Sequence, residues 1–350
     1  MNIGILTSGG DCAGLNSVMY GFAKAIAASD LKAKIFGISN GWTGLINREY
    51  REMKPEEFFG LLNTGGTVIG SSRQPLKIFT DEEKLSVMKE NYKNMDLDVL
   101  LTLGGQGTHK KAAILADAGL KIIGLPKTID NDIFGTDFTF GFHSAVDVAT
   151  ECIDRVRTTA ASHRRTMLVE IMGNKVGWLT LYAGMAGGAD IILIPEIPYD
   201  IEKVIKAATK AERENGYCII AAAEGALSKE EAAMDKKERA QKREEKGEKT
   251  ASERIVKAIA EALNVEARVV VPGYIQRGGN PSAYDRILCT QIGAYAAKLV
   301  EEKKFGISVA INGTKLTYNN LNDIVGETKF VPKDGELVQA ARNTGISFGD

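Results

Sequence analysis

The sequence contains 350 residues, 44% of them hydrophobic, which is enough for two domains that each bury their own core. A formal net charge of -1 excludes a sequence-wide attraction to nucleic acid or to an anionic membrane. Four cysteines without CxxC spacing predict buried, reduced thiols rather than a zinc site. No apolar run approaches membrane-spanning length and the first residues carry no cleavage signal, so we expect a cytoplasmic protein with no membrane partner.

Short apolar runs alternate with helix-length amphipathic stretches along the chain. This alternation predicts an α/β fold with doubly wound parallel sheets, in which ligands bind beyond the carboxyl ends of the strands. The expected strands are residues 3–7, 33–38, 99–103, 122–125, 167–171, 191–194, 218–222 and 269–271.

Two glycine-rich loops each follow an expected strand and open a helix. The first contains Gly9 and Gly10, and the second reads Gly104-Gly105-Gln106-Gly107-Thr108. Small residues at such a place let backbone N–H groups approach a phosphate, although a tight strand-to-helix turn needs the same residues. The first loop has neither the sequence of a Walker A motif nor that of a dinucleotide-binding fingerprint, which argues against an ordinary P-loop ATPase and a dinucleotide dehydrogenase.

A third loop concentrates chemistry at the end of the strand 122–125. It reads Pro126-Lys127-Thr128-Ile129-Asp130-Asn131-Asp132. One carboxylate could accept the proton of an attacking hydroxyl while the other holds Mg²⁺, which prefers oxygen ligands. An Asx-rich turn capped by its own side chains is the structural alternative, and the density of charge favours function.

Later segments add phosphate-binding residue types and one charged stretch. Residues 273–279 place Tyr274, Gln276 and Arg277 in one glycine-bounded loop that suits bidentate phosphate recognition, and Glu224 ends another expected strand. Residues 228–254 are rich in Lys, Glu, Arg and Ala with mixed signs, which predicts a solvated helix or a mobile insertion without a chemical role.

Taken in order, TSGGD, GGQGT, PKTIDND, the Met172-Gly173 turn and GYIQRGG resemble the phosphofructokinase family over nearly the whole chain. The resemblance implies two interleaved Rossmann-like domains. Residues 1–141 and 276–328 would form a phosphoryl-donor domain, and residues 142–275 and 329–350 a sugar-phosphate domain, with the active site between them.

The resemblance also implies roles for individual residues. Asp130 would be the base, supported by Thr128 and Lys127, and Asp132 would hold Mg²⁺ with weak help from Gln106. The donor phosphates would be bound by Gly9, Gly10, Arg73, Gly104, Gly105, Gln106, Gly107 and Thr108, and the sugar phosphate by Arg165, Met172, Gly173, Glu224, Arg268, Tyr274 and Arg277. Arg165 and Arg268 match arginines that reach a neighbouring subunit, which implies a homodimer or homotetramer with shared sugar sites.

Several residues depart from the family pattern. Gln106 replaces an aspartate near the metal, and Asn174 replaces an arginine that faces the transferring group, with Lys175 as a possible substitute. Tyr274 stands where many members have histidine. Tyr20 and Lys24 stand where effector-site arginines are common, which argues against the effector control of those members.

We therefore expect phosphoryl transfer to the 1-hydroxyl of fructose 6-phosphate. Gly107 favours ATP because an acidic residue there would repel its α-phosphate, whereas Lys111 and Lys127 leave pyrophosphate open as the donor. Sedoheptulose 7-phosphate remains an alternative acceptor. A regulatory paralogue that binds sugar phosphate without turnover, and an unrelated binding module on the same fold, are the alternatives from other classes.

Overall fold

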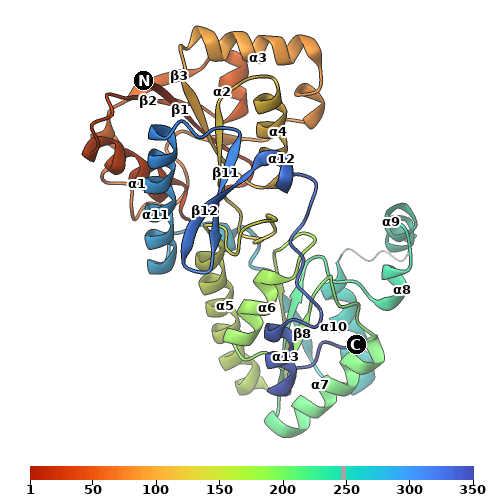
Figure 1. Ribbon diagram of the computed structural model, residues 1–350. Coiled ribbons are helices and arrows are strands. Elements are labelled where there is room, and N and C mark those ends of the chain that lie inside the picture. The colour runs from red at the N-terminus through yellow and green to blue at the C-terminus, as the bar shows by residue number, and fades with distance from the viewer. Residues whose placement is uncertain (246–249) are drawn as a thin grey trace. The chain divides into compact units, whose positions relative to one another are not determined.

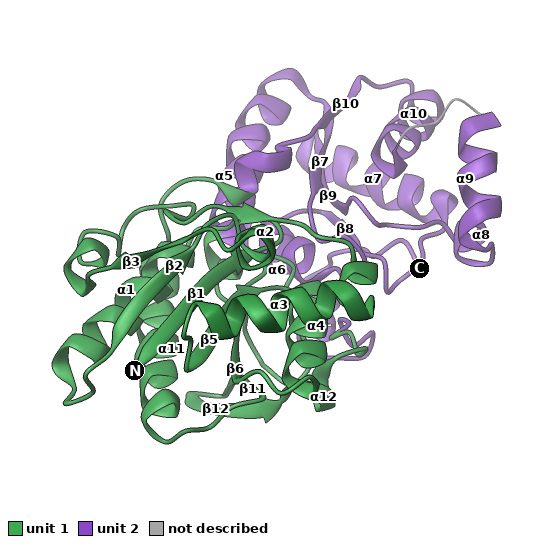
Figure 2. Ribbon diagram, turned by 90° about the horizontal axis from the view of Figure 1, so that it is seen from above, with its two compact units in different colours: residues 1–144, 277–329 green, residues 145–276, 330–350 purple. Residues whose placement is uncertain are grey.

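The computed structural model describes residues 1–245 and 250–350, which form two compact units (Figure 2). Unit 1 comprises residues 1–144 and 277–329, and unit 2 comprises residues 145–276 and 330–350. The chain therefore passes between the units three times. The assignment of a donor role to one domain and of a sugar-phosphate role to the other stays a prediction.

Unit 1 is built on one mixed sheet with the strand order β12-β11-β6-β5-β1-β2-β3, and β4 also pairs with β1. The strands are β1 (Asn2–Ser8), β2 (Lys34–Ile38), β3 (Tyr50–Met53), β4 (Ser71–Ser72), β5 (Val99–Gly104), β6 (Ile122–Pro126), β11 (Ile307–Asn312) and β12 (Lys315–Asn320). The central strands are parallel, with Ile5 opposite Leu101 and Leu101 opposite Ile123. Every residue of β5 and β6 is buried, as expected for strands covered on both faces.

Helices cover both faces of this sheet (Figure 1). They are α1 (Leu15–Ala28), α2 (Trp42–Asn47), α3 (Glu82–Asn94), α4 (Gln106–Asp117), α11 (Ala283–Glu301) and α12 (Leu321–Ile324), with short 3-10 helices at Pro55–Phe58 and Leu76–Ile78. Helices α1 and α11 pack closely because both have glycine at the crossing. A methyl group on Gly21 would lie 2.7 Å from the Cα atom of Thr290, and one on Gly293 would meet the carbonyl oxygen of Val18.

Unit 2 has a smaller sheet of four parallel strands in the order β10-β7-β9-β8. Its strands are β7 (Thr166–Ile171), β8 (Ile191–Leu193), β9 (Cys218–Ala223) and β10 (Ala267–Val270). Its helices are α5 (Phe142–His163), α6 (Trp178–Ala186), α7 (Ile201–Asn215), α8 (Lys229–Ala232), α9 (Lys236–Glu245), α10 (Ala251–Leu263) and α13 (Glu336–Asn343), with a 3-10 helix at Gly273–Arg277. The first residues of α5 belong to unit 1.

Helix α7 shows how local sequence sets an element of unit 2. Asp200 caps its start by accepting a hydrogen bond from the N–H of Glu202, and Gly216 ends it with a left-handed φ of 78°. Val204, Ala208 and Ala211 are spaced so that they lie on one face, and all three are buried in the core of unit 2.

The expected α/β class and the eight expected strands are confirmed, although Ala33, Ile194 and Val271 fall outside β2, β8 and β10. Strands β3, β4, β11 and β12 were not expected. The edge pairs β2·β3 and β11·β12 are antiparallel, and only residues 313 and 314 join the second pair, which is too short a connection for a parallel crossover.

The four cysteines are free thiols, and most of them are buried. Cys12, Cys218 and Cys289 are buried and Cys152 is half-buried, all four as free thiols. Burial raises the pKa of Cys12 to about 12, which makes this thiol unreactive at neutral pH. In the described part of the chain, no helix combines the length and apolar character needed to cross a membrane.

Candidate active site

The loop after β1 brings two arginines against a glycine. A methyl group placed on Gly10 would lie 2.5 Å from Nη1 of Arg277 and 3.3 Å from Nη2 of Arg73. Nη1 of Arg277 also donates a hydrogen bond to the carbonyl oxygen of Asp11 at 3.2 Å. Two guanidinium groups beside a glycine backbone form a place where an anion such as a phosphate can bind.

Lys127 connects this loop with the end of β6. Its Nζ donates to the carbonyl oxygen of Gly10 at 2.5 Å, and the side chain is only 4% exposed. Burial lowers the pKa of Lys127, against the opposing attraction of Asp130 and Asp132. Unit 1 therefore gathers three cationic side chains at Gly10, each from a different segment of the chain.

The second glycine loop leads from β5 directly into α4, with Gly105 as the N-cap residue. A side chain on Gly104 would collide with the side chain of Thr108, whose hydroxyl lies 3.5 Å from the carbonyl oxygen of Ser8. At Gly107, in contrast, an added methyl group would meet nothing within 4 Å. The first N–H groups of α4 remain suited to phosphate oxygens.

His109, in α4, contacts the backbone of the second glycine loop. The sequence analysis did not identify this residue. Its Nδ1 lies 3.0 Å from the carbonyl oxygen of Gly105, and its Nε2 lies 2.8 Å from the hydroxyl of Ser308. Burial lowers the pKa of His109 to about 4, so the ring is neutral at physiological pH. The only signal in the sequence was its spacing of four residues from Gly105 on a helix.

The loop after β6 carries the two predicted carboxylates. The hydroxyl of Thr128 accepts a hydrogen bond from the N–H of Asp130 at 3.0 Å, which fixes the backbone at the predicted base. Oδ1 of Asp132 is buried and has no hydrogen-bond partner among the described residues, and burial raises the pKa of Asp132. A buried carboxylate oxygen of this kind fits a cation such as Mg²⁺.

Gln106 binds the protein itself. Its Nε2 donates to the carbonyl oxygen of Asp132 at 2.8 Å and to the hydroxyl of Thr328 at 3.1 Å. No cluster of three or more His, Cys, Asp or Glu side chains in the described ranges could hold a metal alone. A metal at Asp132 would thus take most of its ligands from phosphate and water, as Mg²⁺ commonly does.

Lys111, in α4, lies beside an aromatic ring. The ammonium of Lys111 lies 5.6 Å from the ring centre of Phe79, and burial lowers the pKa of Lys111.

In unit 2, Oε1 of Glu224 accepts hydrogen bonds from the N–H groups of Gly173 at 3.3 Å and Asn174 at 2.8 Å. A side chain on Gly173 would lie 2.5 Å from a backbone oxygen, so the turn needs glycine.

Met172 joins this turn through its N–H, which donates to Oε1 of Gln276 at 3.2 Å. Tyr274, in the same 3-10 segment, is 83% exposed. The structure therefore brings Met172, Gly173 and Glu224 together in unit 2. Arg277 belongs to unit 1, whereas the other predicted sugar-phosphate residues belong to unit 2.

The two predicted interface arginines share one carboxylate. Nε of Arg165 lies 2.6 Å from one oxygen of Glu266, and Nη2 of Arg268 lies 2.7 Å from the other. Arg268 lowers the pKa of Glu266, and Arg165 contributes in the same direction. Glu266 thus holds both arginines on one edge of unit 2, a role that no sequence motif indicated.

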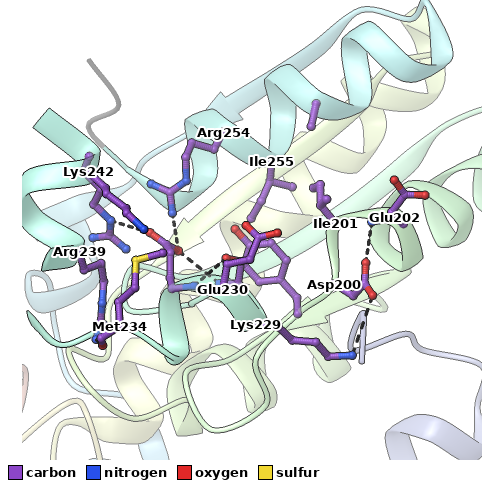
Figure 3. Close-up of a pocket in the computed structure, with 15 residues that line it drawn as sticks. Asp200, Ile201, Glu202, Lys229, Glu230, Met234, Arg239, Lys242, Arg254 and Ile255 are labelled. Atoms are coloured by element: carbon purple, nitrogen blue, oxygen red, sulfur yellow. Dashed lines mark hydrogen bonds and ion pairs between the residues drawn. The ribbon is translucent and has the colours of Figure 1, made fainter. Parts of the chain in front are cut away.

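A cavity of about 420 Å³ lies in unit 2, and none of the predicted site residues lines it (Figure 3). Glu231 lies at its wall, 2.7 Å from Nε of Arg243 and 2.7 Å from Nη2 of Arg254. These ion pairs join α8 to α9 and to the first turn of α10, where the charged segment 228–254 ends. The segment forms α8 and α9 on either side of this contact, and its residues 246–249 lie outside the described residues.

Known proteins with similar sequences and structures are phosphofructokinases. The sequence profile described as Phosphofructokinase matches residues 2–300. A protein of Spirochaeta thermophila named ATP-dependent 6-phosphofructokinase is 49% identical over 356 residues, which cover 99% of this chain and 97% of the relative. ATP-dependent 6-phosphofructokinase 3 of Bacteroides thetaiotaomicron is 41% identical over all of both chains. The solved pyrophosphate-dependent phosphofructokinase of Marinobacter aquaeolei has a TM-score of 0.81 at 22% identity, covering 98% of this chain and 90% of that one, which shows a shared fold.

Proposed function

Because this chain belongs to the phosphofructokinase family, we propose that it transfers the γ-phosphoryl group of ATP to the 1-hydroxyl of fructose 6-phosphate. The observation that carries the proposal is the gathering of Arg73, Lys127 and Arg277 at Gly10, on the same unit as Asp130 and Asp132. Arg73 and Lys127 suit the phosphates of the donor, and Arg277, which was predicted at the sugar phosphate, lies beside them at Gly10. The carboxylates supply the acid–base and metal functions.

In the proposed reaction, Asp130 accepts the proton of the attacking hydroxyl while Thr128 holds its backbone in place. Arg73, Lys127 and Arg277 stabilise the negative charge that spreads over the phosphoryl oxygens in the transition state. Bound at Asp132, Mg²⁺ would neutralise charge on the donor phosphates. Met172, Gly173, Glu224 and Tyr274 are the proposed sugar-phosphate residues of unit 2.

ATP is the proposed donor rather than pyrophosphate. An added methyl group at Gly107 would meet nothing within 4 Å, which leaves open space at the start of α4 where a nucleotide phosphate could lie. The names of the Spirochaeta thermophila and Bacteroides thetaiotaomicron relatives state ATP dependence over nearly full-length alignments.

We also propose a homodimer or homotetramer in which Arg165 and Arg268 serve the sugar phosphate of a neighbouring subunit. The side chain of Arg268 is 65% exposed even though it pairs with Glu266, so its guanidinium is accessible. Mixing inactive Arg268→Ala and Asp130→Asn proteins after dissociation tests this assembly. Recovered activity in the hybrid supports shared sites, and persistent inactivity contradicts them.

The decisive experiment measures initial rates with fructose 6-phosphate, Mg²⁺ and either ATP or pyrophosphate, with direct detection of fructose 1,6-bisphosphate. Asp130→Asn should lower kcat by about 10²- to 10⁴-fold. Asp30→Asn, a change at an exposed residue of the same unit, should leave kcat unaltered. Binding of fructose 6-phosphate without turnover would indicate the regulatory paralogue, and turnover only with sedoheptulose 7-phosphate would change the acceptor.

A further inference from the structure

The ammonium group of Lys329 binds a loop far away in the sequence. Its Nζ donates to Oδ1 of Asn131 at 2.9 Å and to the carbonyl oxygens of Thr136 at 2.9 Å and Asp137 at 2.7 Å. A lysine has three hydrogens to donate, and here three acceptors belong to one short stretch of chain. Lys329 is half-buried, and a partly buried ammonium is stable only when it is well bonded, as it is here.

The backbone next to Lys329 binds the same loop from another direction. Its N–H donates to the carbonyl oxygen of Asp132 at 2.9 Å, and Thr328 forms an antiparallel bridge with Ile133. The side chain of Gln106 donates both to that Asp132 oxygen and to the hydroxyl of Thr328. These contacts therefore hold Asp132 by its backbone, and Oδ1 of its carboxylate has no hydrogen-bond partner among the described residues.

Asn131 receives one of these contacts directly, through its Oδ1. It adopts a left-handed backbone with φ of 52°, which asparagine tolerates better than most residues. Its Oδ1 accepts hydrogen bonds from the N–H of Thr139 at 3.1 Å and from Lys329. Because Asn131 lies between Asp130 and Asp132, its φ and ψ determine how the two carboxylates are directed relative to each other.

We propose that Lys329 is a positioning residue for phosphoryl transfer, which holds Asn131 in its left-handed conformation so that Asp130 and Asp132 keep their separate directions. The inference rests on the proposed function and extends it to a residue outside the three motif loops. It also gives Gln106 a part in holding the same loop. Errors near 1 Å in the placement of a reacting group reduce rates by about 10²-fold, so this support should appear in kcat.

The test compares Lys329→Met with the unmodified chain in the assay with ATP and fructose 6-phosphate. Methionine fills a similar volume without donating hydrogen bonds. We expect kcat to fall about 30- to 100-fold while KM for ATP changes less than about 3-fold, because the cationic cluster at Gly10 is left in place. Lys304→Met, at an exposed lysine of the same unit, is the matched control and should keep its kcat.

A second variant separates positioning from general stability. Asn131→Gly permits the left-handed backbone but removes the acceptor for Lys329, so kcat should again fall about 10-fold or more. If Lys329 acts through Asn131, the double variant should lose clearly less than the product of the two single losses. Fully multiplicative losses would overturn the proposed route.

Lys329→Met with unchanged kcat and a lowered melting temperature would show a purely structural lysine and overturn the inference. If Lys329→Met does not fold, Asn131→Gly decides alone, and an unchanged kcat in that variant would overturn the inference as well. A lack of turnover by the unmodified chain would instead refute the proposed function, and the positioning role with it.

Discussion

Nη1 of Arg277 lies 3.2 Å from the carbonyl oxygen of Asp11, although 266 residues separate the two along the chain. The contact holds the guanidinium beside Gly10, where any side chain would compete with it for space. Glycine is therefore needed at position 10 because it leaves room for the Arg277 side chain, not because the backbone there must be flexible.

Gly10→Ala should displace Arg277 and lower kcat/KM by about 10-fold or more, because a guanidinium would leave the proposed phosphate site. Stability should change little, since the displaced atom ends a flexible side chain. Steady-state kinetics together with a thermal melt check both statements. Gly60→Ala is the control, as a methyl group there would meet nothing within 4 Å. Equal kinetics for the two variants would contradict the role of Arg277.

Gly107→Asp should raise KM for ATP by about 10-fold or more without destabilising the fold. The site has room for a side chain, and an acidic residue in the first turn of α4 interacts favourably with the helix dipole. The added charge would repel a nucleotide phosphate at short range. Gly107→Asn has nearly the same size without the charge, so its KM should rise much less. Similar KM values for both variants would show that volume, not charge, matters there.

The contribution of two histidines to the free energy of unfolding should decrease as pH falls from about 6.5 to about 4. Burial lowers the pKa of His109 from 6.5 to about 4 and that of His143 likewise to about 4, so the unfolded chain binds more protons in this window. The stabilisation is complete above pH 6.5 and lost on acidification, on the order of 3 kcal/mol for the buried His109 and less for the half-buried His143. Urea midpoints at pH 7 and pH 4.5 measure it.

His109→Gln should flatten this pH dependence by removing one of the two groups. His163→Gln is the control because His163 is exposed, and its pH dependence should match the unmodified chain. An unaltered slope in His109→Gln would show that His109 does not bind the extra proton on unfolding.

Glu231→Gln should destabilise the charged segment of unit 2 by about 1–2 kcal/mol. The substitution leaves Arg243 and Arg254 without the carboxylate that both contact, and the side chain of Glu231 is only 12% exposed. Glu230→Gln, at an exposed neighbour, should have almost no effect. Hydrogen exchange of α8 and α9 measures the difference, and equal protection in both variants would contradict it.

Much of unit 1 could be predicted because its signals are local. The buried runs of β1, β5 and β6 mark strands, and the glycines after β1 and β5 mark strand ends that open into helices. The short strand β4 and the polar edge strand β12 carry little apolar pattern, since one consists of two serines and the other faces solvent at several positions. Their pairing comes from the neighbouring strands rather than from their own residues.

By itself, the sequence determined the α/β class, the order of the loops and the residue types suited to phosphate, metal and proton transfer, because periodicity and strand-end glycines act over a few residues. Only the tertiary structure decided that Arg277 lies at Gly10, that Glu266 holds Arg165 and Arg268, and that Lys329 holds Asn131 from 198 residues away. Those contacts follow from the order of strands in each sheet and from the return of the chain to unit 1, and neither leaves a pattern within any short stretch of sequence.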